Sequence, residues 1–298
     1  MPNMDYPAWK YTTEDYTEVP DHWAKEHLLQ GHLDFEGYSE AQISKAVVDL
    51  IDTDCEEWTA TQQEGLAMFR SEGHWNFSKP DSHEELKRWF TIFDKIFFNG
   101  VLTRNCELYW YTAKEAAQNR NNGGKTVFFK KTSFQEFRHP RAQYRRPFAV
   151  IYIKKSRHTL DALGDVRDYL EALLHEMSHA VLFIYSYDSI RDMGTGHGIS
   201  WQQIVQSIDC VARGTLGLRL CFDRDDYMAL EAAGKGDLPN DVELRRLGLD
   251  INRIWTKICL ERFFRRIRSE PNEMSLKILK GCRRLNHCIR SDWVADVI

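Results

Sequence analysis

Two histidines four residues apart, inside one long helical pattern, constrain this chain more than any other feature. Residues 165–185 read DVRDYLEALLHEMSHAVLFIY, and their apolar positions recur at the spacing of one buried helix face. Those positions are Val166, Leu170, Leu173, Leu174, Met177, Val181 and Ile184. On such a helix His175 and His179 project from the same side, one turn apart. Two imidazoles placed in this way can bind one Zn2+ ion at about 2.0–2.1 Å each.

The residue after the first histidine adds a base to this pair. Glu176 would reach a water molecule on the open side of a metal ion held by the two histidines. The pattern HExxH thus puts two ligands and a general base on one rigid element, the arrangement of zinc hydrolases. The motif is short enough to occur by chance. Its weight here comes from the amphipathic helix that carries it and from a third donor downstream.

His197 is the candidate for a third ligand, which a catalytic zinc site needs beside its water. Gly196 and Gly198 flank it, so the backbone can turn tightly and approach a metal ion. Ser200 is expected to cap a following helix over residues 201–213, whose apolar positions face inward. His197 would then lie in a turn between two helices and fold back over the first.

Other ligand sets remain open but fit less well. The metzincin pattern requires Gly and His where this chain has Leu182 and Tyr185, so that class is excluded. Glu231 is an alternative third ligand on a later helix, without a supporting motif around it. Asp188 and Asp192 lie nearer, and we expect them to cap helices or to hydrogen-bond the ligands.

Three segments occur in an order and spacing that identify a family. They are LKRWFTIFDKIFFNGVL at 86–102, LLHEMSHA at 173–180 and GHGISW at 196–201. Together they resemble the SprT-like zinc metalloproteases over residues 82–213. The resemblance implies a zincin-like metalloprotease core, with Zn2+ on His175, His179 and His197 and Glu176 as catalytic base. It also implies protein substrates that are bound or crosslinked to DNA.

The chain departs from the family pattern in its cysteines. Many members carry a zinc ribbon built from cysteines after the protease core, but here no two cysteines form a CxxC pair, so we expect no ribbon. The cysteines are Cys55, Cys106, Cys210, Cys221, Cys259, Cys282 and Cys288. An odd number without metal-ligand or disulfide spacing favours reduced thiols inside a cell.

Composition sets the remaining bounds. The 298 residues, 43% of them hydrophobic, can bury a sizeable core as one or two domains. A net charge of −4 excludes a generally basic nucleic-acid-binding protein. The N-terminus lacks the pattern of a signal peptide, and no apolar run approaches about 18 residues. We therefore expect no membrane partner and a location inside the cell, in the nucleus or the cytoplasm.

Helical patterns surround the motif. Residues 39–67 are expected to form one or two helices. Ser82 is expected to open the first core helix, with Glu85 completing a capping box. The buried stripe of that helix is predicted at Leu86, Trp89, Phe90, Phe93, Ile96 and Phe97. Residues 214–298 have the pattern of a helical extension, with breaks at 234–236 and 271–272.

A small sheet is predicted between the first core helix and the helix at 165–185 that carries the HExxH motif. Its strands are 106–111, 126–129 and 148–153, rich in aromatic and β-branched residues, with a turn at 121–124 between the first two. The predicted fold class is therefore α+β and mainly helical, with a small antiparallel sheet. The predicted domains are an acidic, partly helical segment 1–80, a SprT-like core 81–213 and a helical, basic extension 214–298.

Charge is unevenly distributed along the chain. Residues 1–70 hold fifteen acidic and four basic side chains, whereas 114–157 hold twelve basic and two acidic, and 257–290 hold ten basic and three acidic. Basic groups among aromatic residues suit single-stranded DNA, by phosphate neutralisation and base stacking. The predicted contacts are Lys130, Lys131, Arg141, Arg145 and Arg146. A solvated face, or an internal partner for the acidic segment, is the alternative explanation.

The pattern as a whole favours a zinc-dependent endopeptidase that cleaves protein substrates and binds DNA, preferring single strands. One alternative is an adaptor without catalytic activity that keeps the fold and the zinc ion and binds DNA or protein. Intact Glu176 argues against it, because a purely structural site does not need that carboxylate. Another is a zinc hydrolase whose substrates are not peptides.

Overall fold

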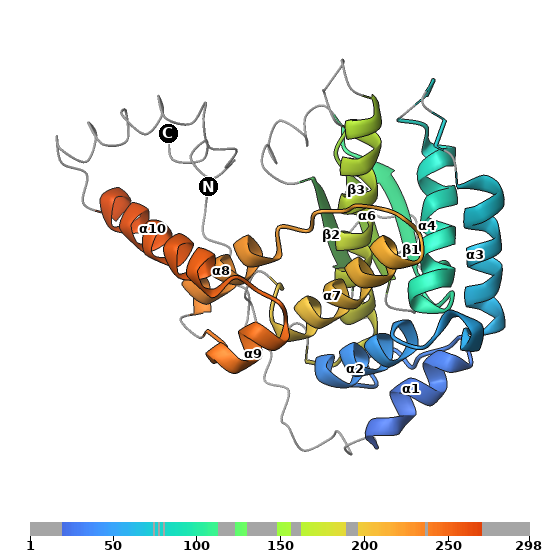
Figure 1. The fold of residues 1–298 in the computed structure, drawn as a ribbon, viewed down its shortest axis with the longest axis horizontal. Coiled ribbons are helices and arrows are strands. Elements are labelled where there is room, and N and C mark those ends of the chain that lie inside the picture. The colour runs from blue at the N-terminus through green and yellow to red at the C-terminus, as the bar shows by residue number, and fades with distance from the viewer. Residues whose placement is uncertain are drawn as a thin grey trace.

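The computed structural model describes residues 20–73, 75–76, 78–79, 81–112, 123–129, 148–155, 162–188, 196–235 and 238–269. In this part of the chain, helices pack against a small three-stranded sheet (Figure 1), so the fold is α+β and mainly helical, as predicted. The helices are α1 Asp21–Leu29, α2 Glu40–Ile51, the short 3-10 helix Cys55–Glu57, α3 Ala60–Glu72, α4 His83–Phe98, α6 Ala162–Tyr185, α7 Ile199–Gly214, α8 Arg224–Lys235, α9 Asp241–Arg246 and α10 Ile251–Ser269. The strands are β1 Cys106–Trp110, β2 Gly124–Phe129 and β3 Phe148–Ile153.

The sheet is mixed, so the predicted antiparallel sheet is wrong. Its order is β1-β3-β2, with β3 parallel to β1 and antiparallel to β2. β3 lies in the centre because it is apolar on both faces. Ala149, Ile151 and Ile153 join the main core, whereas Phe148 and Val150 are buried on the opposite face. The strands on either side of the predicted turn, β1 and β2, are therefore not neighbours in the sheet.

Helix α4, the first core helix of the prediction, begins as predicted, but its capping box is only half formed. The Ser82 side chain accepts a hydrogen bond from the backbone N–H of Glu85. The Glu85 carboxylate instead pairs with Arg88 and accepts from the backbone N–H of Asn76. The backbone N–H of Ser82 donates to the carbonyl of Lys79. A turn that precedes the helix thus takes over the role predicted for Glu85.

One hydrophobic core joins the N-terminal helices to the sheet and to α6. All the predicted buried positions of α4 and α6 lie in it, and so do apolar residues of α1, α2 and α3. Asn99, in the left-handed conformation that ends α4, donates to the Leu28 carbonyl at 2.7 Å and accepts from the Thr59 hydroxyl at 2.6 Å. The described part of the acidic N-terminal segment is thus helical from residue 21 and packs on α4, α6 and α7. The predicted division into three domains stays a prediction.

A second, smaller core lies in the C-terminal helices α8, α9 and α10, to one side of the main body (Figure 1). Its buried residues are Met228, Ala229, Ala232, Leu244, Leu247, Leu249, Ile254 and Ile258. α8 ends at Lys235, at the first predicted break; the second, at 271–272, lies outside the described residues. No helix among the described residues has the length and apolar character needed to cross a membrane.

Candidate metal centre

Helix α6 presents the two motif histidines, and the sheet packs against the same helix (Figure 1). Its apolar face anchors it in the core, with Leu173, Leu174 and Met177 fully buried around the motif. His175 and His179 consequently emerge one turn apart, and their Nε2 atoms lie 3.2 Å from each other. This rigid placement is what the sequence pattern predicts for a pair of metal ligands.

His197 lies in the turn before α7, with its ring against the other two histidines. Gly196 has φ +79°, in the left-handed region, and a Cβ there would lie 3.3 Å from the His179 ring, so glycine suits this position on two grounds. Gly198 has an ordinary φ of −65° and is the N-cap of α7. Ser200 lies inside that helix, so its predicted capping role is wrong, because the helix begins earlier, at Ile199.

Three Nε2 atoms converge at this point. His197 Nε2 lies 3.1 Å from that of His179 and 3.0 Å from that of His175. Each Nε2 carries either a proton or a lone pair, so of three mutual contacts at least one joins two atoms of the same kind. Hydrogen bonds therefore cannot satisfy the triangle. Two nitrogens bound tetrahedrally to one zinc ion lie about 3.3 Å apart, so the triangle fits one shared cation.

The three rings are in the protonation state that a metal requires. Burial lowers the pKa of His179 to about 4, and it lowers the pKa of His175 and His197 well below the ordinary value. The imidazoles are therefore neutral at pH 7, with lone pairs available for coordination. These residues form a group whose donor atoms all lie within 4.8 Å of one another.

Glu176 points from α6 towards the edge strand β2. The hydroxyl of Thr126 lies 2.7 Å from its Oε2 and 2.9 Å from its backbone carbonyl. Gly124, also on β2, leaves room for the carboxylate, because a Cβ there would lie 2.7 Å from the Glu176 Cγ. Burial raises the pKa of Glu176 to about 7, while the hydrogen bond from Thr126 lowers it. A base with such a pKa takes up and releases a proton near neutral pH.

Aromatic rings pack around the imidazoles. Trp201, fully buried on α7, lies 4.8 Å from the His175 ring and 4.7 Å from the His197 ring between centroids. Tyr227 of α8 stacks on His197 at 4.1 Å with an interplanar angle of 19°. These contacts exclude water from the sides of the rings and limit their rotation.

The structure separates the alternative acidic ligands from the histidine group. Glu231 is buried nearby, where its Oε2 accepts from the backbone N–H of His197 at 3.4 Å, but it is not a member of the donor group. Asp188 accepts from the N–H of Glu40, the first residue of α2, so its predicted capping role is confirmed. Asp192 lies outside the described residues.

The predicted nucleic-acid contacts also lie outside the described residues; they are Lys130, Lys131, Arg141, Arg145 and Arg146.

The structure brings other residues to the site that the sequence does not predict there. The sequence predicts Thr126 only as a strand residue and Gly124 only as a turn residue, because nothing in a sequence shows which strand faces which helix. Tyr227, one turn before Glu231 in a short helical pattern, carries no motif that could have pointed to it.

Comparison with known proteins agrees with the site. Residues 86–220 match the family model described as SprT-like family, a stretch that runs from α4 through the sheet and α6 to just beyond α7. It contains the three histidines and Glu176, whereas α8 begins after it. No curated protein and no solved structure matches the chain. Residues 86–220, which contain all three histidines of the triangle and Glu176, therefore form a SprT-like region.

Proposed function

We propose that this protein is a zinc-dependent endopeptidase with a zincin-like core. The observation that carries the proposal is the triangle of three neutral imidazoles at 3.0–3.2 Å, with Glu176 on the same helix. The match of residues 86–220 to the SprT-like family supports a protease-like function. Among the described residues, the group has three histidines and no fourth protein donor, which is typical of catalytic zinc sites that keep one position open.

The residues divide the chemistry among themselves. His175, His179 and His197 would hold the ion, which supplies Lewis acidity towards a water molecule and the scissile carbonyl. Glu176 takes a proton from the attacking water as the new C–O bond forms. It then gives that proton to the leaving amine as the C–N bond breaks. Thr126 holds the carboxylate in place through its hydroxyl.

The environment of Glu176 favours an enzyme over an adaptor. Burying a carboxylate costs folding free energy, so a buried Glu176 beside the histidines favours a role in a reaction. Thr126 and Gly124 both accommodate it from β2. A site with only a structural role would need its ligands and not this base.

Proteins bound or crosslinked to DNA are the proposed substrates. β2, which contacts Glu176, leads directly into the basic residues Lys130 and Lys131. Single-stranded DNA held by this basic segment would bring a DNA-bound protein close to the site and raise its local concentration there. The protein would then act at DNA, in the nucleus where the cell has one.

The test measures metal and cleavage in one preparation. We expect one zinc per chain by elemental analysis, and cleavage of a DNA-bound protein that rises when single-stranded DNA is added. Glu176→Gln should retain the zinc and lose the cleavage, because an amide cannot accept the proton. Zinc without cleavage in the wild-type protein would favour the adaptor. Cleavage that is independent of DNA would retain the protease and remove the proposed substrate class.

A further inference from the structure

We propose that Glu231 and Tyr227, both on α8, are positioning residues of the metal site that hold His197 as its third ligand. The inference rests on the proposed function in that His175, His179 and His197 bind a metal ion. It extends the site beyond the family region, because the matched residues end at 220 and α8 begins at Arg224.

Two faces of helix α8 pack against different parts of the protein. Tyr227 and Glu231 are four residues apart and therefore share one face of the helix. That face lies against the histidines, through the Tyr227 ring and the Glu231 carboxylate. Met228, Ala229 and Ala232 belong instead to the second core with α9 and α10. The C-terminal helices thus form a small packed unit whose inner face reaches the metal site.

Glu231 and Gln202 hold the backbone of His197 from both sides. His197 lies in a turn, so its position does not follow from the hydrogen bonds of a helix. Its N–H donates to Glu231 Oε2 at 3.4 Å, and its carbonyl accepts from Gln202 Nε2 at 3.4 Å. Both partners are buried, with Gln202 fully enclosed and Glu231 5% exposed. A negative charge fixed beside the third ligand also favours a cation at the histidines.

Tyr227 fixes the ring of the same histidine. Its ring lies parallel to the His197 imidazole at 4.1 Å and 4.7 Å from that of His175. Trp201 meets the His197 ring nearly at a right angle, at 85° and 4.7 Å. Contacts from two directions leave the imidazole little freedom to rotate away from the other two. A pre-oriented ligand binds a metal ion more tightly, because less conformational freedom is lost on binding.

Arg224 fastens the start of α8 to α7. Its guanidinium donates to the carbonyls of Gln202 at 3.2 Å and Leu247 at 2.7 Å. The Gln202 side chain donates in turn to the Arg224 carbonyl at 3.2 Å. Gln202 therefore touches both His197 and the first residue of α8, so a shift of this helix would move the third ligand.

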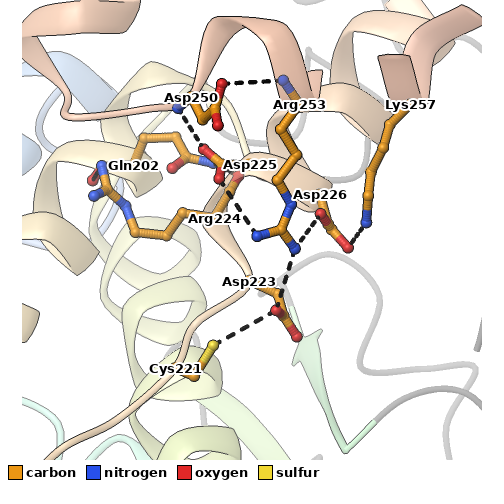
Figure 2. Close-up of polar contacts among 9 residues, drawn as sticks. All are labelled: Gln202, Cys221, Asp223, Arg224, Asp225, Asp226, Asp250, Arg253 and Lys257. Atoms are coloured by element: carbon orange, nitrogen blue, oxygen red, sulfur yellow. Dashed lines mark hydrogen bonds and ion pairs between the residues drawn. The ribbon is translucent and has the colours of Figure 1, made fainter. Parts of the chain in front are cut away.

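Ion pairs anchor α8 to α10 on the other side (Figure 2). Arg253 of α10 lies within 3.9 Å of Asp223, 3.7 Å of Asp225 and 2.9 Å of Asp226. Lys257 also pairs with Asp226. Figure 2 shows Arg253 reaching between the three carboxylates, which lie at the start of α8. This network explains how a helix outside the family region keeps a fixed place at the site.

The test measures the zinc dissociation constant of the full chain by competition with a chromophoric chelator. Glu231→Leu removes the acceptor and the charge, and we expect it to weaken zinc binding by about 10-fold or more. Glu231→Gln keeps an oxygen for the His197 N–H and should weaken binding less. Tyr227→Leu should weaken binding, whereas Tyr227→Phe keeps the ring and should stay near wild type. Glu64→Gln and Tyr109→Leu are matched controls at exposed positions on α3 and β1.

A second measurement separates positioning from folding. The zinc-free variants should unfold at the wild-type temperature, and added zinc should raise that temperature less than in wild type. Wild-type zinc affinity in Glu231→Gln, Glu231→Leu and Tyr227→Leu would overturn the inference. If Glu231→Leu does not fold, wild-type affinity in the other two would overturn it. Wild-type protein that binds no zinc would remove both the proposed function and this inference. Zinc binding that depends on His175 but on neither Glu231 nor Tyr227 would remove the inference alone.

Discussion

The hydroxyl of Thr126, on the edge strand β2, lies 2.7 Å from Oε2 of Glu176 on α6. This one hydrogen bond links the sheet to the proposed base across fifty residues of sequence. A carboxylate that must accept a proton from a defined direction gains from such a neighbour, because its rotamer is then fixed before the substrate binds.

Thr126→Val keeps the shape of the side chain and removes its hydroxyl. We expect kcat for peptide cleavage to fall about 10-fold, a typical decrease for a residue that orients a reacting group. KM and zinc content should stay unchanged. Steady-state kinetics check this, with Thr91→Val on α4 as the control, since the Thr91 hydroxyl donates to the carbonyl of Lys87 within its own helix. An unchanged kcat would mean that other groups orient Glu176.

Gly124→Ala should displace the base by steric contact. The new Cβ would lie 2.7 Å from Cγ and 2.9 Å from Oε1 of Glu176, closer than non-bonded atoms approach. We expect strongly reduced cleavage with retained zinc. Gly123→Ala is the matched control, because its Cβ would meet only the Ala172 Cβ, at 3.4 Å. Equal activities of the two variants would contradict this role of Gly124.

Removal of any imidazole should release the metal. His175→Ala, His179→Ala and His197→Ala each leave two donors, which cannot close the site, so zinc content should fall well below one per chain. Elemental analysis after dialysis measures it, with His83→Ala at the start of α4 as control. Full occupancy in His197→Ala would remove that residue from the ligand set and leave the pair on α6.

Asp94, a buried residue of α4, should make folding stability depend on pH. Burial raises its pKa to about 6 from 3.8, although hydrogen bonds from Leu102 and Thr103 lower it. The folded state therefore holds this proton more tightly than the unfolded state. Its stabilising effect is complete below about pH 4 and is lost as the pH rises through about 6, a change of about 3 kcal/mol.

Asp94→Asn removes this titration. The free energy of unfolding of wild type minus that of the variant should fall between about pH 4 and pH 6 and level off above about pH 7. Urea denaturation of both zinc-free proteins across this range measures the difference. A difference that does not change with pH would show that Asp94 is ionised in the folded state throughout.

The basic segment should carry the salt dependence of DNA binding. Changing Lys130, Lys131, Arg141, Arg145 and Arg146 to Ala should flatten the log–log salt slope by about one unit for each phosphate that the variant no longer neutralises. Binding of labelled single-stranded and duplex DNA at several salt concentrations measures the slope, and single strands should bind better. Lys45→Ala, at an exposed ion pair on α2, is the control. An unchanged slope would place the DNA-binding surface at the basic residues in 257–290.

Local patterns could be predicted from the sequence because their causes are local. The buried stripes of α4 and α6 follow from side-chain spacing, and His175, Glu176 and His179 from a motif within one helix. His197 could be found because Gly196 must adopt a left-handed conformation beside the His179 ring. This conformation favours glycine, so the sequence has a glycine directly before His197.

Relationships between distant segments could not be predicted in this way. β3 lies in the centre of the sheet because both of its faces are covered by other residues, and the sequence of a turn does not predict this strand order. The capping box at Ser82 failed because a residue outside the helix, Asn76, binds Glu85. Thr126 and Tyr227 reach the site only through the packing of β2 and α8. Glu231, considered as a ligand from sequence, instead accepts a hydrogen bond from the backbone of His197.

The packing of α2 against α7 determines which fragments of this chain can fold. The hydroxyl of Ser44 on α2 lies 3.0 Å from the carbonyl of Ser200 and 2.9 Å from Oε1 of Gln203, in the first turn of the helix that follows His197. A fragment trimmed to the family borders would expose the apolar sides of α4, α6 and α7 and free the start of α7. Excision of the protease region as an autonomous piece should therefore yield a poorly folding, aggregation-prone polypeptide, whereas a fragment that begins before α1 would retain the support of the third histidine.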